Sequence, residues 1–248
     1  MVAKAAQLAL GEQAIAVTAR SPSLAEGELD EAVQLAGSIG IRHHIVDTGE
    51  IDDPRYAKNN PDRCYFCKST LYEHLDKLLD QLRVNVIANG TNADDLGDYR
   101  PGLRAADEHR VRSPLADVGL TKSEVRSLAA DWELTVWDKP AMPCLASRIA
   151  YGEQVTDERL RMIDRAEQFL REQGSREVRV RYHRGDLARI EVPVEQLAFF
   201  GEAAVRDSLV RRFTELGFQN VTVDLKGFRS GSLNALIPLE TLRGETRK

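Results

Sequence analysis

Three cysteines are the residues of this chain whose type and spacing best suit chemistry. The segment NPDRCYFCKST places Cys64 and Cys67 in a CxxC pair, and Cys144 is the third cysteine of the sequence. By spacing alone, a CxxC pair can be half of a zinc site, a redox pair or two ligands of an iron–sulfur cluster. The plain alternative is that the pair is incidental and that Cys144 is a small core residue. Three thiolates are one ligand short of a structural zinc site, but they suit a 4Fe–4S cluster that keeps one iron open.

The surroundings of the cysteines favour a functional role. A thioredoxin-like pair opens a helix directly after a strand, whereas Asn-Asn-Pro precedes this pair. Cys144 lies in KPAMPCLASR, an irregular segment with two prolines before the cysteine, where the backbone can approach a ligand. Ser147 and Arg148 follow it, and a guanidinium at this point is suited to hold an anionic substrate.

The elements that must position these residues alternate between strands and helices. Strand-like apolar patterns cover 13–19, 42–48 and the segment VNVIANGTNADD, and helical patterns cover 28–40 and 67–82. The alternation predicts an α/β fold with a parallel sheet and crossover helices, and such sheets bind ligands beyond the carboxyl ends of their strands. Thr121 and Glu124 have the spacing of a capping box at the start of a further helix.

The pattern changes around DKPAMPCLASRIAYGEQVT, where we place a domain boundary near residue 150. A helix over 156–173, strands in EVRVRYH and LARIEVP, a helix over 194–216 and a strand in NVTVDL follow. This α-β-β-α-β order predicts a smaller α+β domain over 151–248 with a mostly antiparallel sheet. Arg179 and Arg181 alternate along one of its strands and share a face, which by itself reads as a solvated strand surface.

Charge and hydropathy exclude several classes of protein. The net charge of −5 and the acidic composition argue against a general binder of nucleic acids or anionic membranes. No apolar run approaches the ~18–20 residues that cross a bilayer, and no signal-peptide pattern opens the chain. We therefore expect a cytoplasmic protein.

Several segments, spread over essentially the whole chain, together resemble the LarE family of ATP-dependent sulfurtransferases. They are NPDRCYFCK, ANGTNADDLGDYRPGLRAADE, SPLADVGLTKSEVR, KPAMPCLASRI and VRVRYH with LARIEV. The resemblance implies an adenine nucleotide alpha hydrolase (PP-loop pyrophosphatase) domain over 1–150 and a small substrate and oligomerisation domain after it. The implied reaction makes thiocarboxylates from the two carboxylates of a pyridinium mononucleotide, in the synthesis of the nickel-pincer cofactor of lactate racemase. It also implies ATP, Mg²⁺, a sulfide donor and a homo-oligomer, with a hexamer typical of the family.

The resemblance assigns expected roles to particular residues. Nucleotide contacts fall on two segments, and Asp94 or Asp95 is suited to bind Mg²⁺, with a helix N-terminal cap as the equal alternative. A substrate site with arginines facing a phosphate-bearing ligand forms between subunits. The expected nucleotide-binding residues are Thr18, Ala19, Arg20, Gly90, Thr91, Asp94 and Asp95, and the expected substrate-binding residues are Lys68, Ser147, Arg148, Glu167, Arg179, Arg181 and Glu191.

The number of cysteines separates two kinds of family member. A member with only the cysteine matching Cys144 sacrifices that thiol and ends with dehydroalanine, whereas a member that also carries the CxxC holds a 4Fe–4S cluster with all three thiolates. This sequence has Cys64, Cys67 and Cys144 and matches the second kind, with Cys144 as the catalytic and ligand residue.

One departure from the family pattern bears on activity. The SGGxDS turn that cradles the ATP phosphates in the family is absent from this sequence, which starts in a helix beginning MVAKAA, so we expect a truncated amino terminus. The alternatives are sacrificial transfer from Cys144, another PP-loop synthetase or tRNA-thiolating enzyme, and a non-catalytic metal- or nucleotide-binding protein. The acidic charge counts against the tRNA enzyme.

Overall fold

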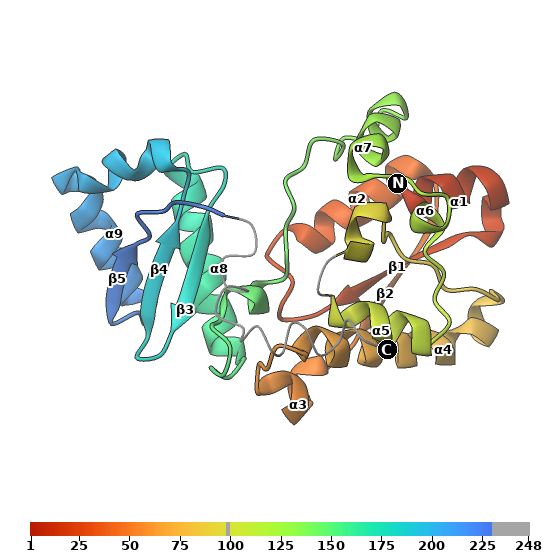
Figure 1. The fold of residues 1–248 in the computed structure, drawn as a ribbon, viewed down its shortest axis with the longest axis horizontal. Helices are drawn as coiled ribbons and strands as arrows, with labels where there is room; N and C mark the ends of the chain where they lie inside the picture. Colours follow the sequence, from red (N-terminus) through yellow and green to blue (C-terminus); the bar gives the residue numbers. More distant parts are fainter. Residues whose placement is uncertain (98–99, 230–248) are drawn as a thin grey trace. The chain divides into compact units, whose positions relative to one another are not determined.

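The computed structural model describes residues 1–97 and 100–229, arranged as two compact units. The first unit comprises Met1–Asp53 and Asp62–Ala141, and the second comprises Pro54–Pro61 and the chain from Met142 onward. Figure 1 shows the elements of each unit. Asp98 and Tyr99 of the quoted family segment, and 230–248 of the predicted second domain, lie outside the described residues. No helix in the described ranges is both long and apolar enough to span a membrane.

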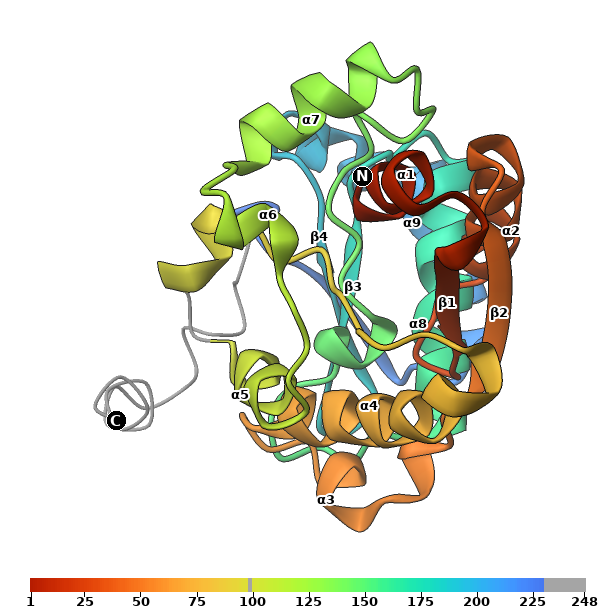
Figure 2. The same cartoon turned by 90° about the vertical axis from the view of Figure 1, so that its right-hand side faces the viewer.

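A two-stranded parallel sheet lies in the first unit. Strand β1 (Ile15–Arg20) pairs with β2 (Arg42–Asp47) along its whole length, from Ile15 opposite Arg42 to Arg20 opposite Asp47. Helix α2 (Glu28–Ile39) connects them and ends at Gly40 in the left-handed conformation, with φ of 76°. Figure 2 shows the two strands side by side. The predicted α/β class with a parallel sheet is confirmed for this part of the chain.

Helices surround this sheet, and the core beside it is small and aliphatic. Helix α1 spans Val2–Leu10 and ends at Gly11. The predicted capping box opens α7 (Lys122–Asp131), where the Thr121 hydroxyl and the Glu124 carboxylate each accept from the other residue's backbone. The residues buried together here are Ala14, Ala36, Ile39, Ile41, Ala129 and Leu134.

A pair of packed helices forms the rest of the first unit. Helix α4 (Arg63–Leu82) lies against α5 (Pro101–Glu108), and Tyr72, Ala105, Ala106 and Val111 are buried between and beside them. Helix α4 begins four residues before the amphipathic run that the sequence suggested, so both cysteines of the CxxC pair are helical. The unit also contains the 3-10 helices η1 (Gly11–Gln13), η2 (Glu50–Asp52) and η3 (Ala93–Gly97) and the short helix α6 (Pro114–Asp117).

The strand predicted in VNVIANGTNADD is wrong in extent. The segment makes one isolated bridge, between Ala88 and Arg112, with backbone bonds from Asn89 N to Arg112 O and from Arg112 N to Ile87 O. Val86 stays 63% exposed although its type favours a strand interior. A strand needs a neighbour of comparable length, and here the partner is only the short segment before α6.

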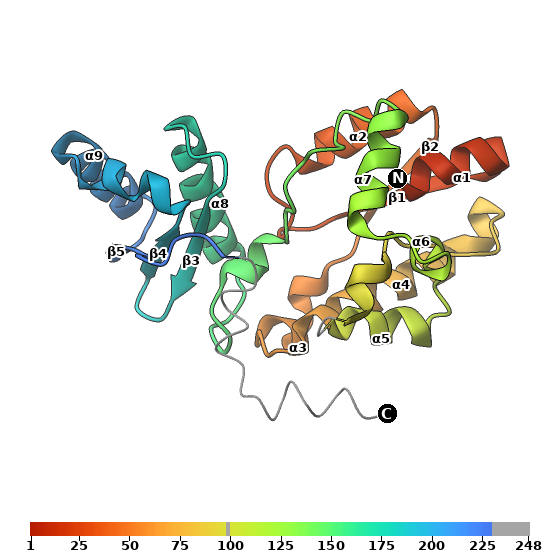
Figure 3. The same cartoon turned by 45° about the horizontal axis from the view of Figure 1, so that its top comes forward.

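The second unit carries a three-stranded sheet in the order β3-β4-β5. Strand β3 (Arg179–His183) is antiparallel to β4 (Leu187–Glu191), which is parallel to β5 (Asn220–Val223). The prediction of a mostly antiparallel sheet is therefore corrected to one antiparallel and one parallel pair of strands. The second pair is parallel because the connection through α9 (Ala203–Glu215) returns the chain to the end of the sheet at which β4 begins. Figures 1 and 3 show α9 and α8 (Asp157–Glu172) beside this sheet.

The single helix predicted over 194–216 is two elements. A 3-10 helix, η5 (Val194–Gly201), precedes α9, and Glu202 between them has extended backbone angles, with φ of −65° and ψ of 132°.

The units divide differently from the predicted boundary at residue 150. Residues 142–150 belong to the second unit, and so does Pro54–Pro61, which includes α3 (Pro54–Ala57). Asn59 explains the second difference: its side-chain nitrogen donates to the carbonyl oxygens of Ile149 (3.1 Å), Ala150 (2.9 Å) and Glu153 (3.0 Å). This side chain is fully buried. Such long-range bonds leave no local pattern in the sequence.

Candidate functional site

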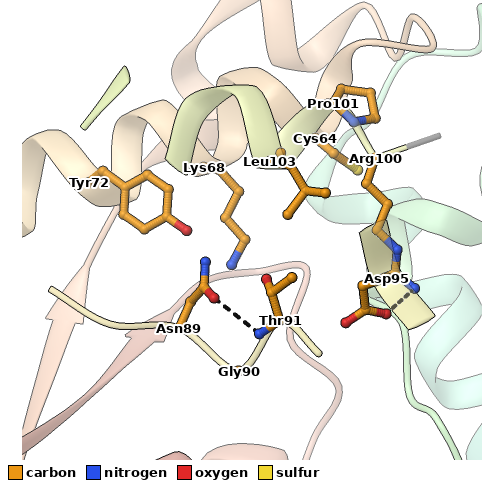
Figure 4. Close-up of a pocket in the computed structure, with 11 residues that line it drawn as sticks. Cys64, Lys68, Tyr72, Asn89, Gly90, Thr91, Asp95, Arg100, Pro101 and Leu103 are labelled. Carbon is orange, nitrogen blue, oxygen red and sulfur yellow. Dashed lines mark hydrogen bonds and ion pairs between the residues drawn. The ribbon is translucent and has the colours of Figure 1, made fainter. Parts of the chain in front are cut away.

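A cavity of about 400 Å³ lies in the first unit between α4, the start of α5 and the Asn-Gly-Thr segment. Figure 4 shows the side chains that line it. Helix α4 contributes three of them at a spacing of four residues, which places them on one face of the helix. The lining residues are Cys64, Lys68, Tyr72, Asn89, Gly90, Thr91, Asp95, Arg100, Pro101, Gly102 and Leu103.

The cavity brings together several residues that the sequence pointed to. Cys64, Lys68, Gly90, Thr91 and Asp95 all line it, although they were assigned to three separate roles. Tyr72, Asn89 and Arg100 also line the cavity, and they were not among the predicted site residues. The four-residue spacing from Cys64 through Lys68 to Tyr72 was the signal that could have found Tyr72.

The Asn-Gly-Thr segment has its own hydrogen bonds. The side-chain oxygen of Asn89 accepts from the Thr91 backbone N–H and from the Ser113 hydroxyl, both at 3.0 Å. A Cβ added at Gly90 would meet no protein atom within 4 Å, so packing within the chain does not require glycine there. The open space at Gly90 is compatible with a ligand approaching the backbone.

The two aspartates predicted as Mg²⁺ ligands or caps both hold backbone groups. Asp94 accepts from the N–H of Lys122, the first residue of α7, at 2.8 Å. Asp95 accepts from the Asn92 N–H at 3.1 Å and forms an ion pair of 2.8 Å with Arg100. Asp94 thus accepts from an N–H group at the start of α7, whose N-cap residue is Thr121, and both the cap role and Mg²⁺ binding stay predictions.

The predicted nucleotide residues on β1 lie away from this cavity. Thr18, Ala19 and Arg20 occupy the second half of the strand and are not among the lining residues. Arg20 forms two hydrogen bonds of 2.6 and 2.7 Å with Asp47, which hold the pKa of that exposed carboxyl below its ordinary value. The Thr18 hydroxyl lies 2.9 Å from Nε2 of His43, whose pKa is lowered mainly by burial and further by His44.

No disulfide joins the three cysteines, which all lie in the described part of the chain. Cys64 and Cys144 are exposed and Cys67 is partly buried. Cys64 and Cys67 lie one turn apart in α4, and the guanidinium of Arg63 lies 3.9 Å from the Cys64 sulfur. Cys144 belongs to the second unit. Within either unit, the described residues include no group of three or more His, Cys, Asp or Glu side chains that could hold a metal ion.

A buried network of charged side chains lies behind Cys144 in the second unit. Arginines from the Cys144 segment, α8, β3 and β4 surround two fully buried glutamates. All of the second-unit residues predicted for substrate binding take part in it or contact it: Ser147, Arg148, Glu167, Arg179, Arg181 and Glu191.

Arg148 holds the backbone of the Cys144 turn. Its side chain is 1% exposed, and two of its nitrogens donate to the Glu167 carboxylate at 2.9 and 3.2 Å. The remaining nitrogen donates to the carbonyl oxygens of Pro143 and of Cys144 (3.0 Å), and to the Ser147 hydroxyl at 3.2 Å. Each guanidinium nitrogen therefore has a protein acceptor, which makes Arg148 a residue that positions the Cys144 turn.

The two buried glutamates join this turn to the sheet. Glu167 also accepts from the Val180 backbone N–H at 3.0 Å and from Arg171 at 2.8 Å. Glu191 accepts from Arg181 at 3.0 and 2.8 Å, and Arg181 in turn donates to the Ser147 carbonyl oxygen at 3.1 Å. Both ends of the Cys144–Ser147 turn are thus fixed by an arginine that a buried glutamate orients.

The interpretation of Arg179 and Arg181 as a solvated strand surface is wrong. Both side chains are only 6% exposed. Burial and, next in size, the charge of Arg148 lower the pKa of Arg179 to about 10. Alternation predicted correctly that the two arginines share a face, but it could not show which face is covered.

The sequence is similar to those of known proteins over most of its length. No protein-family model matches it. It is 47% identical over 237 residues to an uncharacterized protein of Synechocystis sp., covering 96% of this chain and 88% of that protein. It is 35% identical over 235 residues to pyridinium-3,5-bisthiocarboxylic acid mononucleotide synthase of Lactiplantibacillus plantarum. This match covers 94% of this chain and 84% of the synthase. An uncharacterized protein of Methanocaldococcus jannaschii is 29% identical over 218 residues, which are 88% of this chain and 82% of that protein.

Proposed function

The chain belongs to the LarE family, that of pyridinium-3,5-bisthiocarboxylic acid mononucleotide synthase, and we propose that it is an ATP-dependent sulfurtransferase in nickel-pincer cofactor biosynthesis. The observation that carries the proposal is 35% identity to that synthase over 94% of the chain. The substrate that we propose is the biscarboxylate form of a pyridinium mononucleotide. Its carboxylates become thiocarboxylates.

The proposed chemistry has two steps for each carboxylate. A carboxylate oxygen first attacks the α-phosphorus of ATP, which forms an acyl adenylate and releases pyrophosphate. A hydrosulfide then attacks the acyl carbon, the bond from that carbon to the AMP oxygen breaks, and the sulfur loses its proton to solvent. The products are a thiocarboxylate and AMP, and neither step needs an oxidant or a reductant.

The first unit supplies the groups that we propose for binding ATP. Gly90 leaves open space beside the backbone, and Lys68 brings a positive charge into the same cavity. We propose that Thr18, Ala19 and Arg20 contact the nucleotide from the carboxyl end of β1, as expected for a parallel sheet. Asp94 or Asp95 would hold Mg²⁺, an ion that prefers carboxylate oxygens and keeps several of its waters.

The chemistry of the three thiols fits a 4Fe–4S cluster. Each is at least partly exposed, and the two on α4 share one face of the helix. Cys64, Cys67 and Cys144 would hold it, and the bound cluster would supply one open iron for a transferable sulfide. Arg148 and Arg181 would keep the Cys144 turn in one conformation.

Three further properties belong to the same proposal. The first unit would have the adenine nucleotide alpha hydrolase fold, and the second would contribute to substrate binding and oligomer contacts. We propose a cytoplasmic homo-oligomer, with a hexamer as the form suggested by the resemblance. The excess of arginine over carboxylate around Ser147 supports a phosphate-bearing substrate.

Cys144 itself is the alternative source of the transferred sulfur. Cys144 is exposed, so its own thiol is accessible to an acyl adenylate. If Cys144 donated its sulfur, the Cβ–S bond would break with loss of a Cα proton and leave dehydroalanine. We favour the cluster because the chain carries Cys64 and Cys67 as well.

Anaerobic reconstitution with iron and sulfide tests the cluster. Wild-type protein should gain iron, acid-labile sulfide and broad visible absorption, and each of Cys64→Ala, Cys67→Ala and Cys144→Ala should lose that absorption. His74→Ala is the matched control, because His74 lies on the same helix and bonds to the Thr70 carbonyl oxygen. Absorption that survives in any single cysteine variant would contradict a site shared by the three thiols.

A further inference from the structure

Three hydrogen-bond donors point into one part of the cavity and have no acceptor there. Figure 4 shows the Tyr72 hydroxyl, the Lys68 ammonium and the side-chain nitrogen of Asn89 directed toward one another from α4 and from the Asn-Gly-Thr segment. Among the described residues, none of these three groups has a hydrogen-bond acceptor or an ion-pair partner. Donors that converge on a cavity are suited to a ligand that brings acceptor atoms.

The donors are held in place by the protein around them. Tyr72 is only 3% exposed and packs in the core between α4 and α5, so its ring is held in place while it lines the cavity. Asn89 accepts from the Thr91 N–H and the Ser113 hydroxyl through the same oxygen. These two bonds fix which atom of the amide is oxygen, and they leave its NH₂ group directed into the cavity.

The charge of the cavity is positive where the donors meet. Lys68 brings one charge, and the carboxylate that lines the same cavity, Asp95, is occupied by Arg100 at 2.8 Å and by the Asn92 N–H. Lys68 is exposed and Asn89 is partly buried, so these donors are accessible to a ligand that enters the cavity. A ligand that offers only acceptor oxygens and carries negative charge would satisfy all three donors.

We propose that Tyr72, Asn89 and Lys68 form a subsite for an anionic oxygen group, either a phosphate or a carboxylate. The two candidate sources rest on the proposed function, in which ATP brings phosphates and the pyridinium substrate brings carboxylates. The anion subsite itself follows from the donors alone. Tyr72 and Asn89 are binding residues that supply two neutral hydrogen bonds, and Lys68 supplies the charge.

Direct binding to two small probes tests the subsite without turnover. Inorganic pyrophosphate offers phosphate without a carboxylate, and pyridine-3,5-dicarboxylate offers carboxylates without a phosphate. Titration calorimetry with the full chain should show that at least one of them binds. Tyr72→Phe removes one hydroxyl and little else, and it should weaken that binding about tenfold, since hydrogen bonds to charged groups are worth about 1.5 kcal/mol or more.

A second variant and a matched control separate the subsite from general damage. Asn89→Asp keeps an acceptor for Thr91 and Ser113 but turns a carboxylate oxygen toward the anion, so it should weaken binding more than Tyr72→Phe does. Tyr65→Phe removes a hydroxyl from the same helix that bonds to Glu108 and does not line the cavity, and it should bind like the wild type. Should Asn89→Asp not fold, Tyr72→Phe alone decides.

The outcomes either support or overturn the subsite. Weaker binding of pyrophosphate in Tyr72→Phe assigns the subsite to phosphate, and weaker binding of the dicarboxylate assigns it to carboxylate. Wild-type affinity for both probes in Tyr72→Phe, or no binding of either probe to the wild type, would overturn it. A chain that binds the probe through Tyr72 but transfers no sulfur would refute the proposed function and leave the subsite standing.

Discussion

Replacing Arg148 by methionine removes the cation on which the Cys144 turn depends. The variant loses two hydrogen bonds to Glu167 and those to the Pro143 and Cys144 carbonyl oxygens, at a side chain that is 1% exposed. Removing one member of a buried ion pair costs about 3–5 kcal/mol, because the other charge stays buried. Arg171 remains 2.8 Å from Glu167, so we expect the lower end, about 3 kcal/mol. Urea unfolding of wild type and variant measures this difference.

Arg171→Met is the matched control for this prediction. Arg171 pairs with the same carboxylate but is 30% exposed, and no hydrogen bond from it to the Cys144 turn is observed. Its replacement should cost about 1 kcal/mol or less, as partly solvated pairs do. Arg148→Met should also speed the alkylation of Cys144 relative to Cys64, while Arg171→Met should not. Equal costs for the two variants, or an unchanged alkylation rate of Cys144 in Arg148→Met, would refute the positioning role.

Two further predictions concern stability. Asn59→Ala should destabilise the second unit by about 3 kcal/mol, because it leaves the carbonyl oxygens of Ile149, Ala150 and Glu153 without their buried donor; a urea midpoint equal to the wild type would contradict this. Glu124 has its pKa lowered from 4.5, first by the Thr121 N–H and then by the Thr121 hydroxyl. Its contribution to stability is therefore fully present above pH 4.5 and is lost as the pH falls through the lower folded pKa. The difference in unfolding free energy between wild type and Glu124→Gln should shrink between about pH 7 and about pH 3, and a constant difference would argue against the capping box.

Local patterns predicted the elements whose causes are local. The helix that ends at Gly40 and the strand over Arg42–Asp47 follow from apolar periodicity and a glycine stop, and the capping box at Thr121 follows from a three-residue spacing. The segment VNVIANG has an equally good strand pattern but makes one bridge. A strand depends on a partner elsewhere in the chain, and a single segment carries no information about that partner.

The sequence predicted several residues of the candidate site, but it did not predict which of them contact one another. The spacing of the cysteines and the quoted segments selected Cys64, Lys68, Gly90 and Thr91, which meet in one cavity. Burial decided the rest. From the sequence, Arg148 is predicted to bind an anion, but in the structure its nitrogens donate to Glu167 and to the backbone around Cys144. The type of Tyr72 suggests a core residue, but its hydroxyl faces the cavity.

The proposed sulfur transfer is tested most directly by mass spectrometry of the small-molecule product. The protein, reconstituted anaerobically, is given ATP, Mg²⁺, the pyridinium biscarboxylate mononucleotide and sulfide, with a sample lacking ATP as the control. The account predicts replacement of a carboxylate oxygen by sulfur only when ATP is present, at more than one product per chain, with the mass of Cys144 unchanged. An unaltered substrate in the presence of ATP would contradict the proposed function, and a single product per chain with dehydroalanine at residue 144 would contradict the cluster as the source of sulfur.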